Sequence, residues 1–318
     1  MSIVGRRLAL TLGAGALLGA GGAARAETVL RVGDQIAGNR SVMEAAGVLA
    51  DVPYRIRWSQ FPAAAPLLEA LNAGALDVGF TGDVPFLFVY ASGVPVRVIG
   101  AVRGGAKSQA ILVPRGSPIR TLADLNKGRK LAVNKGGNGH YLALALLDHA
   151  GIDPASVNIV TMPPPDARLA LAGGAVDAWS VWDPYVSIAI ADDGARVLAD
   201  ATGVYGNKSF DLAHLDAIAG KRAALEDFEG RLARARRWAL SHVEENATQV
   251  STLTRIPAPL IAQSLSNRAA TPIAIDDQVI AETQGEADLF TRYHVLPAHL
   301  DVSGAFDRGF AGALASAQ

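Results

Sequence analysis

Apolar residues change their spacing in a regular order between residues 28 and 200. Short runs rich in Val, Ile and Leu are typical of buried strands, and they alternate with longer runs in which apolar residues recur at helical spacing. The predicted strands cover residues 28–33, 54–58, 76–81, 95–102, 110–113, 130–133, 157–161, 176–181 and 195–198. The predicted helices between them cover residues 41–50, 63–72, 84–91, 140–150, 164–172 and 184–191. This alternation predicts an α/β fold with mostly parallel sheets covered on both faces.

From Arg222 onward the pattern becomes helical. Apolar residues recur at helical spacing through Arg222–Arg255, which predicts one long helix that ends before Pro257. Residues 261–265 and 278–293 predict two further helices. We expect the chain to cross back near Ser209–Ala213 and this helical tail to pack on the first part of the fold.

Two stretches of the chain, 100 residues apart, share one pattern. Asn72–Asp83 reads NAGALDVGFTGD, and Ala172–Asp183 reads AGGAVDAWSVWD. A repeat of this length is too long for a solenoid and indicates two lobes with the same strand–loop–helix plan. Coincidence is the alternative, because Gly-Ala-Val/Leu-Asp is a common turn into a strand. The predicted division is 27–105 with 210–318 as lobe 1, and 106–209 as lobe 2.

The N-terminus has the features of an export signal. Arg6 and Arg7 precede the apolar run Leu8–Gly19, and Ala24-Arg25-Ala26 is a small-x-small cleavage site. The run is shorter than the ~20 residues that a membrane span needs, and it is too rich in glycine for a buried first helix. We therefore predict that residues 1–26 are a signal peptide. The paired arginines permit twin-arginine export without establishing it.

Composition narrows the class of protein. The chain has 318 residues, of which 50% are hydrophobic and 19% charged, so it can fill two globular cores. Removing Arg6, Arg7 and Arg25 leaves 26 basic against 30 acidic residues, which argues against nucleic acid as a partner. The absence of cysteine excludes disulfides, thiolate metal sites and a cysteine nucleophile. These features predict a soluble exported protein, most simply periplasmic.

Motifs of catalysis and metal binding are absent from the sequence. There is no G-x-S-x-G, H-E-x-x-H or Walker motif, and the six histidines are scattered. His294 and His299 are close in sequence, but Pro297 separates them and their spacing does not place them on one helical face. The sequence therefore predicts no catalytic residues, no metal and no cofactor.

Three predicted strands lead through glycine-containing loops into helices, at Asp34–Arg40, Thr81–Pro85 and Asn134–His140. Ligands of open α/β sheets bind at the carboxyl ends of strands. Helix N-termini offer unpaired N–H groups and a partial positive charge, and glycine lets an anion approach them closely. These loops predict a site for a small anion without a metal. For residues 136–139, an ordinary flexible turn is the alternative.

The two tryptophans of the second repeat have different predicted roles. Alternation along the strand places Trp179 on one face and Trp182 on the other, at the end of the strand. We expect Trp179 to lie in the core and Trp182 to cover the apolar tail of a ligand. Asp183 is expected to cap the next helix or to pair with a ligand ammonium. Alternatively, both tryptophans pack between strand and helix.

Four segments carry a resemblance to a known family. They read FTGDVP (80–85), ILVPRGSPIRTLADLNKGRKLAV (111–133), GGNGHY (136–141) and VDAWSVWDPY (176–185). The sequence resembles the periplasmic substrate-binding proteins of ABC importers for aliphatic sulfonates, in the wider sulfonate, nitrate and taurine group. The resemblance covers residues 27–200 and, more loosely, the helical tail. It implies a two-lobed periplasmic binding protein fold of type II, in which each lobe is a mixed, mostly parallel sheet flanked by helices.

The resemblance also implies a set of ligand-binding residues in the cleft between the lobes. They are Gln35, Thr81, Gly82, Asp83, Ser108, Gly137, Asn138, Gly139, His140 and Trp182, with Asp183 beside them. The sequence departs from the family at residues 137–139, because relatives often have serine or threonine just before the histidine. An amide and bare backbone replace those hydroxyl donors here, which leaves the identity of the sulfonate open.

These inferences predict a binding protein that delivers an organosulfonate to an ABC permease in the inner membrane and acts as a monomer. A binding protein for nitrate or taurine, an exported sensor of the same ligand, and an enzyme of cofactor biosynthesis on the same fold are the alternatives. The export signal and the absence of a nucleophile–base pair favour the binding protein over the enzyme.

Overall fold

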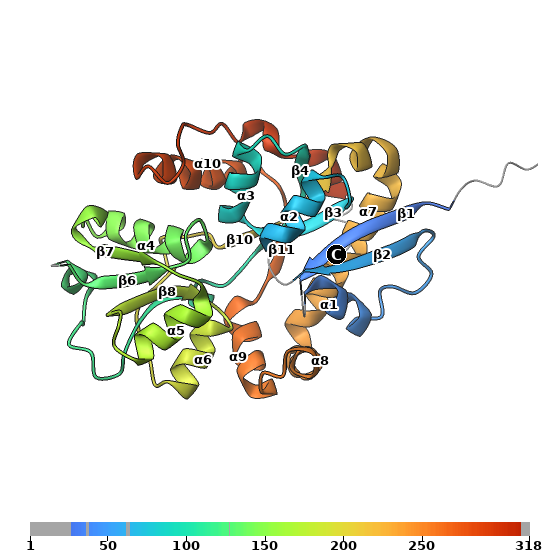
Figure 1. Cartoon of the computed structure of the whole chain (residues 1–318). Coiled ribbons are helices and arrows are strands. Elements are labelled where there is room, and N and C mark those ends of the chain that lie inside the picture. Colours follow the sequence, from blue (N-terminus) through green and yellow to red (C-terminus); the bar gives the residue numbers. More distant parts are fainter. Residues whose placement is uncertain (1–26, 36–37, 62–63, 127, 313–318) are drawn as a thin grey trace, which may run out of the picture.

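The computed structural model describes residues 27–35, 38–61, 64–126 and 128–312. The predicted signal peptide lies outside these ranges. Within them the chain forms two mixed sheets flanked by helices, as Figure 1 shows. The first sheet has the strand order β11 (Thr271–Ile273), β4 (Val96–Arg103), β10 (Lys208–His214), β3 (Val78–Gly82), β1 (Val29–Gln35), β2 (Arg55–Phe61). The second has the order β7 (Asn158–Thr161), β6 (Lys130–Val133), β8 (Ala178–Trp182), β5 (Gln109–Val113), β9 (Arg196–Asp200).

Both sheets follow the same plan. Counted from one edge, each sheet begins with three parallel strands, in the order β2-β1-β3 in one sheet and β7-β6-β8 in the other. An antiparallel strand then pairs with the third of them, β10 with β3 and β5 with β8. The two repeated sequence stretches thus end in equivalent central strands, β3 and β8. The predicted α/β architecture of two mixed, helix-flanked sheets is confirmed.

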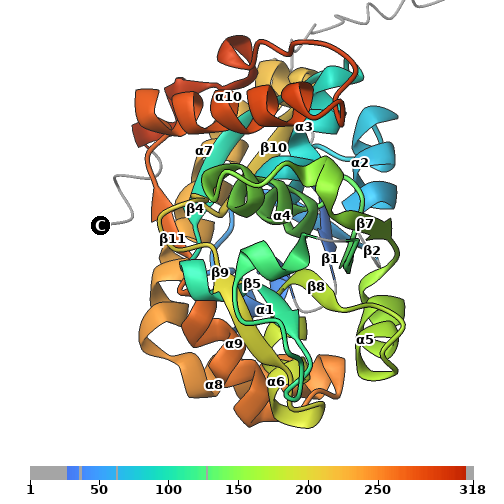
Figure 2. The ribbon, with the colours of Figure 1, turned by 90° about the vertical axis from the view of Figure 1, so that its left-hand side faces the viewer.

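Helices cover the faces of both sheets and extend beyond them. Those from the first and last parts of the chain are α1 (Asn39–Ala45), α2 (Ala64–Asn72), α3 (Asp83–Ala91), α7 (Leu215–Ser241), α8 (Val243–Thr254), α9 (Ala258–Arg268) and α10 (Asp277–Arg292). Those from the middle are α4 (Asn138–His149), α5 (Pro164–Ala172) and α6 (Tyr185–Asp192). Figure 2 shows α4 in the centre, with α10 above it and α9 below. Among the described residues, every helix is too short or too polar to serve as a membrane span.

The helical tail differs from its prediction. Arg222–Arg255 is not one helix: α7 begins earlier, at Leu215, and ends at Ser241, and His242 has non-helical angles (φ −123°, ψ 45°) before α8 begins. The apolar spacing continues across this break because α8 packs against α9 around Ala247, Val250 and Ile261. Strand β11 was not predicted, because it has only three residues and contains a proline, which is tolerated at a sheet edge.

The core confirms the role predicted for Trp179. Its side chain is buried in a cluster with Leu171, Val176 and Val181 of the second sheet. A larger cluster joins residues of both sheets with α10, and includes Phe86, Leu131 and Phe290. The two sheets and their helices are therefore in direct apolar contact in this conformation.

Candidate functional site

The three predicted strand ends do lead into helix starts, from β1 to α1, from β3 to α3 and from β6 to α4. At the first of them the protein satisfies its own N–H groups. Asp34, at 2% exposure, accepts the N–H of Asn39 at 3.1 Å and that of Arg40 at 2.8 Å. Gln35 is the last residue of β1 and is half-buried, while residues 36 and 37 of this loop lie outside the described ranges.

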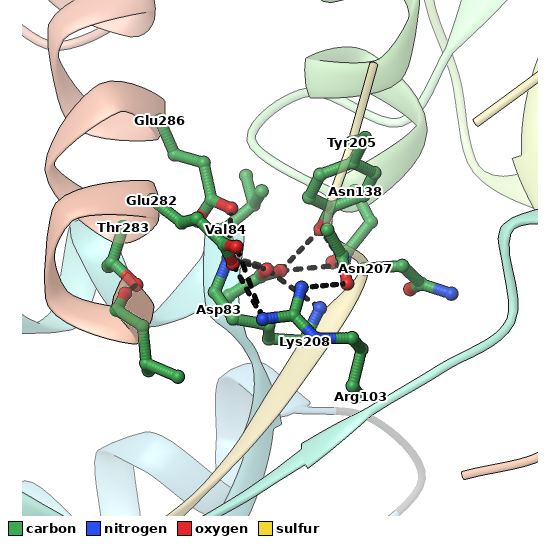
Figure 3. Close-up of polar contacts among 12 residues, drawn as sticks. Asp83, Val84, Arg103, Asn138, Tyr205, Asn207, Lys208, Glu282, Thr283 and Glu286 are labelled. Carbon is green, nitrogen blue, oxygen red and sulfur yellow. Dashed lines mark hydrogen bonds and ion pairs between the residues drawn. The ribbon is translucent and has the colours of Figure 1, made fainter. Parts of the chain in front are cut away.

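Asp83, at the second helix start, is fully engaged with other residues, as Figure 3 shows. Its carboxylate is completely buried. Oδ1 accepts the N–H of Val84 at 2.9 Å, the amide of Asn138 at 3.0 Å and the hydroxyl of Tyr205. Oδ2 accepts the N–H of Lys208 at 2.9 Å. Asp83 therefore joins β3 to β10 and to the start of α4.

A buried charge cluster lies behind Asp83. The ammonium of Lys208, with no exposed side-chain surface, lies 3.4 Å from Asp83 Oδ2, 3.4 Å from Glu282 Oε2 and 2.5 Å from Glu286 Oε1. Burial alone would lower the pKa of Lys208, but the charges of Asp83 and Glu286 raise it, so the ammonium stays charged. Burial, followed by the charge of Asp83, raises the pKa of Glu286 well above its usual range. Lys208 is therefore engaged by three carboxylates, while Glu286 Oε2 has no hydrogen-bond partner among the described residues.

Two glycines allow α4 to approach both sheets closely. A Cβ on Gly82 would lie 2.5 Å from Asn138 Oδ1, and a Cβ on Gly139 would lie 2.5 Å from the carbonyl oxygen of Ser180. Gly137 is the extended residue just before α4. The structure thus brings residues 82 and 83 into direct contact with Asn138, at the meeting point of the two sheets.

Thr81 and His140 flank this contact and differ in their bonding. Thr81 is buried, and its Oγ1 has no hydrogen-bond partner among the residues that the structure describes. His140 is buried against Phe290, with ring centroids 5.5 Å apart, and its Nδ1 accepts the N–H of Gly136 at 3.3 Å. Burial, with a smaller effect of Lys135, lowers the pKa of His140 to about 4. The imidazole is therefore neutral near pH 7 and carries no charge for an anion.

Ser108 lies where the chain crosses from the first sheet to the second. Its hydroxyl donates to the carbonyl of Gly105 at 2.8 Å and accepts the amide of Asn207 at 2.9 Å. Asn207 lies at the return crossing and also accepts the side-chain amide of Gln109. Ser108 therefore ties the two crossings together, and its hydroxyl is already used.

Trp182 is the last residue of β8, and Asp183 follows it. Trp182 is half-buried, pairs with Gln109 of β5 and meets Tyr185 edge-on at 6.4 Å between ring centroids. Asp183 Oδ1 accepts the N–H of Ser187, in the first turn of α6, at 2.9 Å and its hydroxyl at 2.7 Å. Oδ2 accepts the amide of Asn267 at 2.9 Å. Burial raises the pKa of Asp183, and these hydrogen bonds act in the opposite direction.

The sequence model of the NMT1-like family matches residues 37–254. The chain belongs to this family. It is also 36% identical over 277 residues, 86% of each chain, to a protein of Escherichia coli (strain K12) named "Putative aliphatic sulfonates-binding protein".

Solved structures confirm the fold of this NMT1-like family member. The crystal structure of the periplasmic aliphatic sulphonate binding protein SsuA from Escherichia coli has a TM-score of 0.80 and 33% identity, and covers 88% of this chain and 92% of that one. The alkanesulfonate-binding protein SsuA from Xanthomonas axonopodis pv. citri, bound to MOPS, has a TM-score of 0.78 and 33% identity, and covers 89% and 99%. The predicted periplasmic binding protein fold and the resemblance to sulfonate-binding proteins are therefore confirmed.

Several residues around the junction were not predicted from the sequence. Tyr205, Asn207, Lys208, Glu286 and Asn267 hold the predicted residues in place. Asn207 and Lys208 lie next to the predicted crossing near Ser209–Ala213, but no other sequence signal marks these residues, because each lies far along the chain from its partner. In the described ranges, no three His, Asp or Glu side chains are grouped so that they could hold a metal ion.

Proposed function

We propose that this protein is the solute-binding component of an ABC importer. It captures an aliphatic sulfonate between two lobes and delivers it to a permease in the inner membrane. The observation that carries this proposal is the 36% identity to the Escherichia coli relative named for aliphatic sulfonates, which extends over 86% of both chains.

The lobes are proposed to be 27–105 with 210–318, and 106–209. Only two chain crossings join them near Gly104 and Asn207, where the N–H of Gly104 donates to the carbonyl of Asn207 at 2.8 Å. Two short crossings make a hinge, and closure around a ligand is the working motion. Small-angle scattering is expected to give a smaller radius of gyration with a saturating ligand than without it. An unchanged radius would contradict closure.

The predicted site residues divide into two groups by their bonding. Gln35, Thr81 and Trp182 are proposed to contact the ligand, because each lies at a strand end and the hydroxyl of Thr81 is unpaired. Asp83, Ser108, Asn138, His140 and Asp183 frame the site, because their polar groups already bond within the protein. Gly82 permits the close approach of Asn138 to β3, Gly139 permits that of α4 to β8, and Gly137 lies against Asn134 of its own loop.

Calorimetric titration tests the substrate class. The mature protein is titrated with linear alkanesulfonates, taurine, nitrate, and carboxylates of the same chain lengths. We expect binding of alkanesulfonates and much weaker binding of the matched carboxylates. Preference for carboxylates, or for nitrate alone, would overturn the assignment. Mass spectrometry of bound ligand recovered from purified protein is expected to return the sulfonate chemically intact, whereas a converted product would indicate an enzyme.

The proposed location is the periplasm, where the protein acts as a monomer after cleavage before Glu27. The Escherichia coli structure to which it is similar is itself described as periplasmic. Terminal sequencing of protein from a periplasmic fraction is expected to start at Glu27. A soluble cytoplasmic protein that keeps Met1 would contradict this location.

A further inference from the structure

The helix-start N–H groups that the sequence analysis assigns to an anion are partly occupied. Asp34, Asp83 and Asp183 each accept N–H groups at a helix start of the protein itself. His140 is neutral near pH 7, and Lys208 is enclosed by three carboxylates. A full positive charge for a sulfonate would therefore come from another side chain near this junction.

Arg268 is such a side chain. It is the last residue of α9 and lies seven residues after Ile261 and four after Ser264, both of which are buried. Residues at this spacing share one face of a helix. Arg268 therefore lies on the same side of α9 as these buried residues, at the end of the helix where that side becomes exposed.

The end of α9 is held against the junction of the sheets. The carbonyl of Arg268 accepts the N–H of Gly105, at the first crossing, at 2.5 Å. The neighbouring Asn267 donates its side-chain amide to Asp183. Arg268 thus lies beside Asp183, which follows Trp182 directly, in the region proposed to hold the ligand.

The negative charge of Asp183 acts on Arg268, but the two side chains form no direct ion pair. The side chain of Arg268 makes no hydrogen bond or ion pair with any residue that the structure describes, and it is exposed. Desolvation by the surrounding protein nevertheless lowers the pKa of Arg268, and the charge of Arg236 lowers it further. Arg268 thus keeps exposed surface that a ligand can reach.

The charges nearest to Arg268 compensate it only in part, because Arg236 opposes its charge and Asp183 favours it. Arg236 is itself neutralised by Asp211, with Nη1 and Nη2 at 2.6 and 2.7 Å from the two carboxylate oxygens. Asp183 already accepts bonds from Ser187 and Asn267. A partly desolvated cation without a direct ion pair is costly, and a bound anion would offset that cost.

We propose that Arg268 binds the sulfonate group of the ligand and supplies the positive charge of the site. This inference rests on the proposed function and names the residue that selects an anion there. The planar guanidinium can donate two parallel N–H bonds to two sulfonate oxygens. The guanidinium would supply hydrogen-bond donors in place of the hydroxyl groups that relatives often have where this chain has Gly137, Asn138 and Gly139.

The test compares Arg268→Gln and Arg268→Lys with Arg57→Gln. Arg57 lies on β2, is equally positive and exposed, and has no hydrogen-bond or ion-pair partner among the described residues. Titration with ethanesulfonate is expected to show a loss of affinity of about tenfold to a hundredfold for R268Q, the range of one charge-assisted hydrogen bond pair. R268K should lie between, because it keeps the charge and loses the fork. R57Q should bind like the wild type.

A second readout separates binding from folding. Arg268 has no side-chain partner, so ligand-free thermal unfolding of R268Q is expected at the wild-type temperature. The neutral analogue ethanesulfonamide should lose no affinity in R268Q. Equal affinity of R268Q and R57Q for ethanesulfonate would overturn the role of Arg268 alone. Failure of the wild type to bind any alkanesulfonate would overturn the proposed function, and this inference with it.

Discussion

Asp77 and Asp177 make the same pair of backbone contacts, each with the neighbouring strand of its own sheet. The N–H of Asp77 donates to the carbonyl of Arg31 at 2.7 Å, and its carboxylate accepts the N–H of Arg31 at 2.7 Å. Asp177 does the same with Lys130, at 2.9 and 2.8 Å. The repeated Asp in the two sequence stretches thus links β3 to β1 in the first sheet and β8 to β6 in the second.

The two carboxylates differ in burial, which predicts different costs of removal. Asp77 has 2% side-chain exposure and pairs with Arg31 and Lys221, whereas Asp177 has 29% and pairs with Arg129. Asp77→Asn should lower the free energy of unfolding by about 3 kcal/mol or more, because it leaves two cations without a partner. Asp177→Asn should cost about 1 kcal/mol or less. Urea unfolding of both variants measures this, and equal losses would contradict it.

The contribution of Asp77 should also depend on pH. Burial would raise the pKa of Asp77, but hydrogen bonds from Arg31 and Lys221 outweigh it and leave the pKa lowered. A carboxylate with a lowered pKa stabilises the fold above its unfolded pKa of about 3.9, and this stabilisation is lost as pH falls through the folded value. The difference in unfolding free energy between wild type and D77N should therefore be constant near neutrality and shrink below about pH 4.

Gly139 is predicted to be intolerant of a side chain. Its Cβ would lie 2.5 Å from the carbonyl oxygen of Ser180, and this backbone atom cannot rotate away. Gly139→Ala should therefore destabilise the protein by about 1–3 kcal/mol, in spite of the better helix propensity of alanine. Gly116→Ala is the control, because a Cβ there meets nothing within 4 Å. Chemical unfolding should separate the two variants, and a neutral G139A would show that α4 can shift away from β8.

His140 is predicted to make the fold less stable in acid. Burial lowers the pKa of His140 from 6.5 to about 4. Between these two pH values the unfolded chain therefore binds a proton at His140 more readily than the folded protein does. Stability from His140 is complete above about pH 6.5 and is lost as pH falls toward the folded value. Between about pH 7 and pH 5 the wild type should lose about 2 kcal/mol relative to His140→Gln. Affinity for ethanesulfonate should stay flat over the same range, because the ring remains neutral; a fall with rising pH would place a protonated His140 in the site.

The contact of Asn138 with Asp83 and Tyr205 is predicted to favour closure. Its amide donates to Asp83 at 3.0 Å and to the Tyr205 hydroxyl at 2.6 Å. Asn138→Ala removes both bonds, and we expect about a tenfold loss of ligand affinity and a larger ligand-free radius of gyration. Asn158→Ala is the control, because Asn158 is exposed on β7. Wild-type affinity in N138A would show that the contact only supports the fold.

The sequence predicted the helices and strands well where the apolar spacing itself marks where an element begins and ends. β3 and β8 were visible because Asp77 and Asp177 precede equal apolar runs, and α5 was predicted with both of its ends. The break at His242 was not, because no glycine or proline marks it and the apolar spacing continues into α8. Tertiary packing of α8 on α9 decides that break, and local pattern cannot record it.

The site was only partly predictable for a related reason. The strand ends that carry Thr81, Asp83 and Trp182 follow from the strand–helix alternation. Their partners do not, because Tyr205 and Lys208 reach Asp83 from 122 and 125 residues away. Whether a carboxylate such as Asp83 is free or buried in a charge cluster depends on these distant residues. The position of Arg268 in the sequence also does not predict a role in binding, because an arginine at a helix end is usually solvated.

Trp182 is predicted to set the preference for ligand length. Its ring is half-buried at the end of β8 and leaves part of its face uncovered, whereas Trp179 is 1% exposed in the core. Each methylene that is buried against apolar surface contributes about 0.8 kcal/mol, so affinity for alkanesulfonates should rise with chain length in the wild type. Trp182→Ala should flatten this rise while it changes methanesulfonate binding little. Trp179→Phe is the control: it should lower the unfolding free energy by leaving space in the core and keep the dependence on chain length. Titration of each variant with methane-, butane- and octanesulfonate measures the slope, and equal losses at all three lengths would remove Trp182 from contact with the tail.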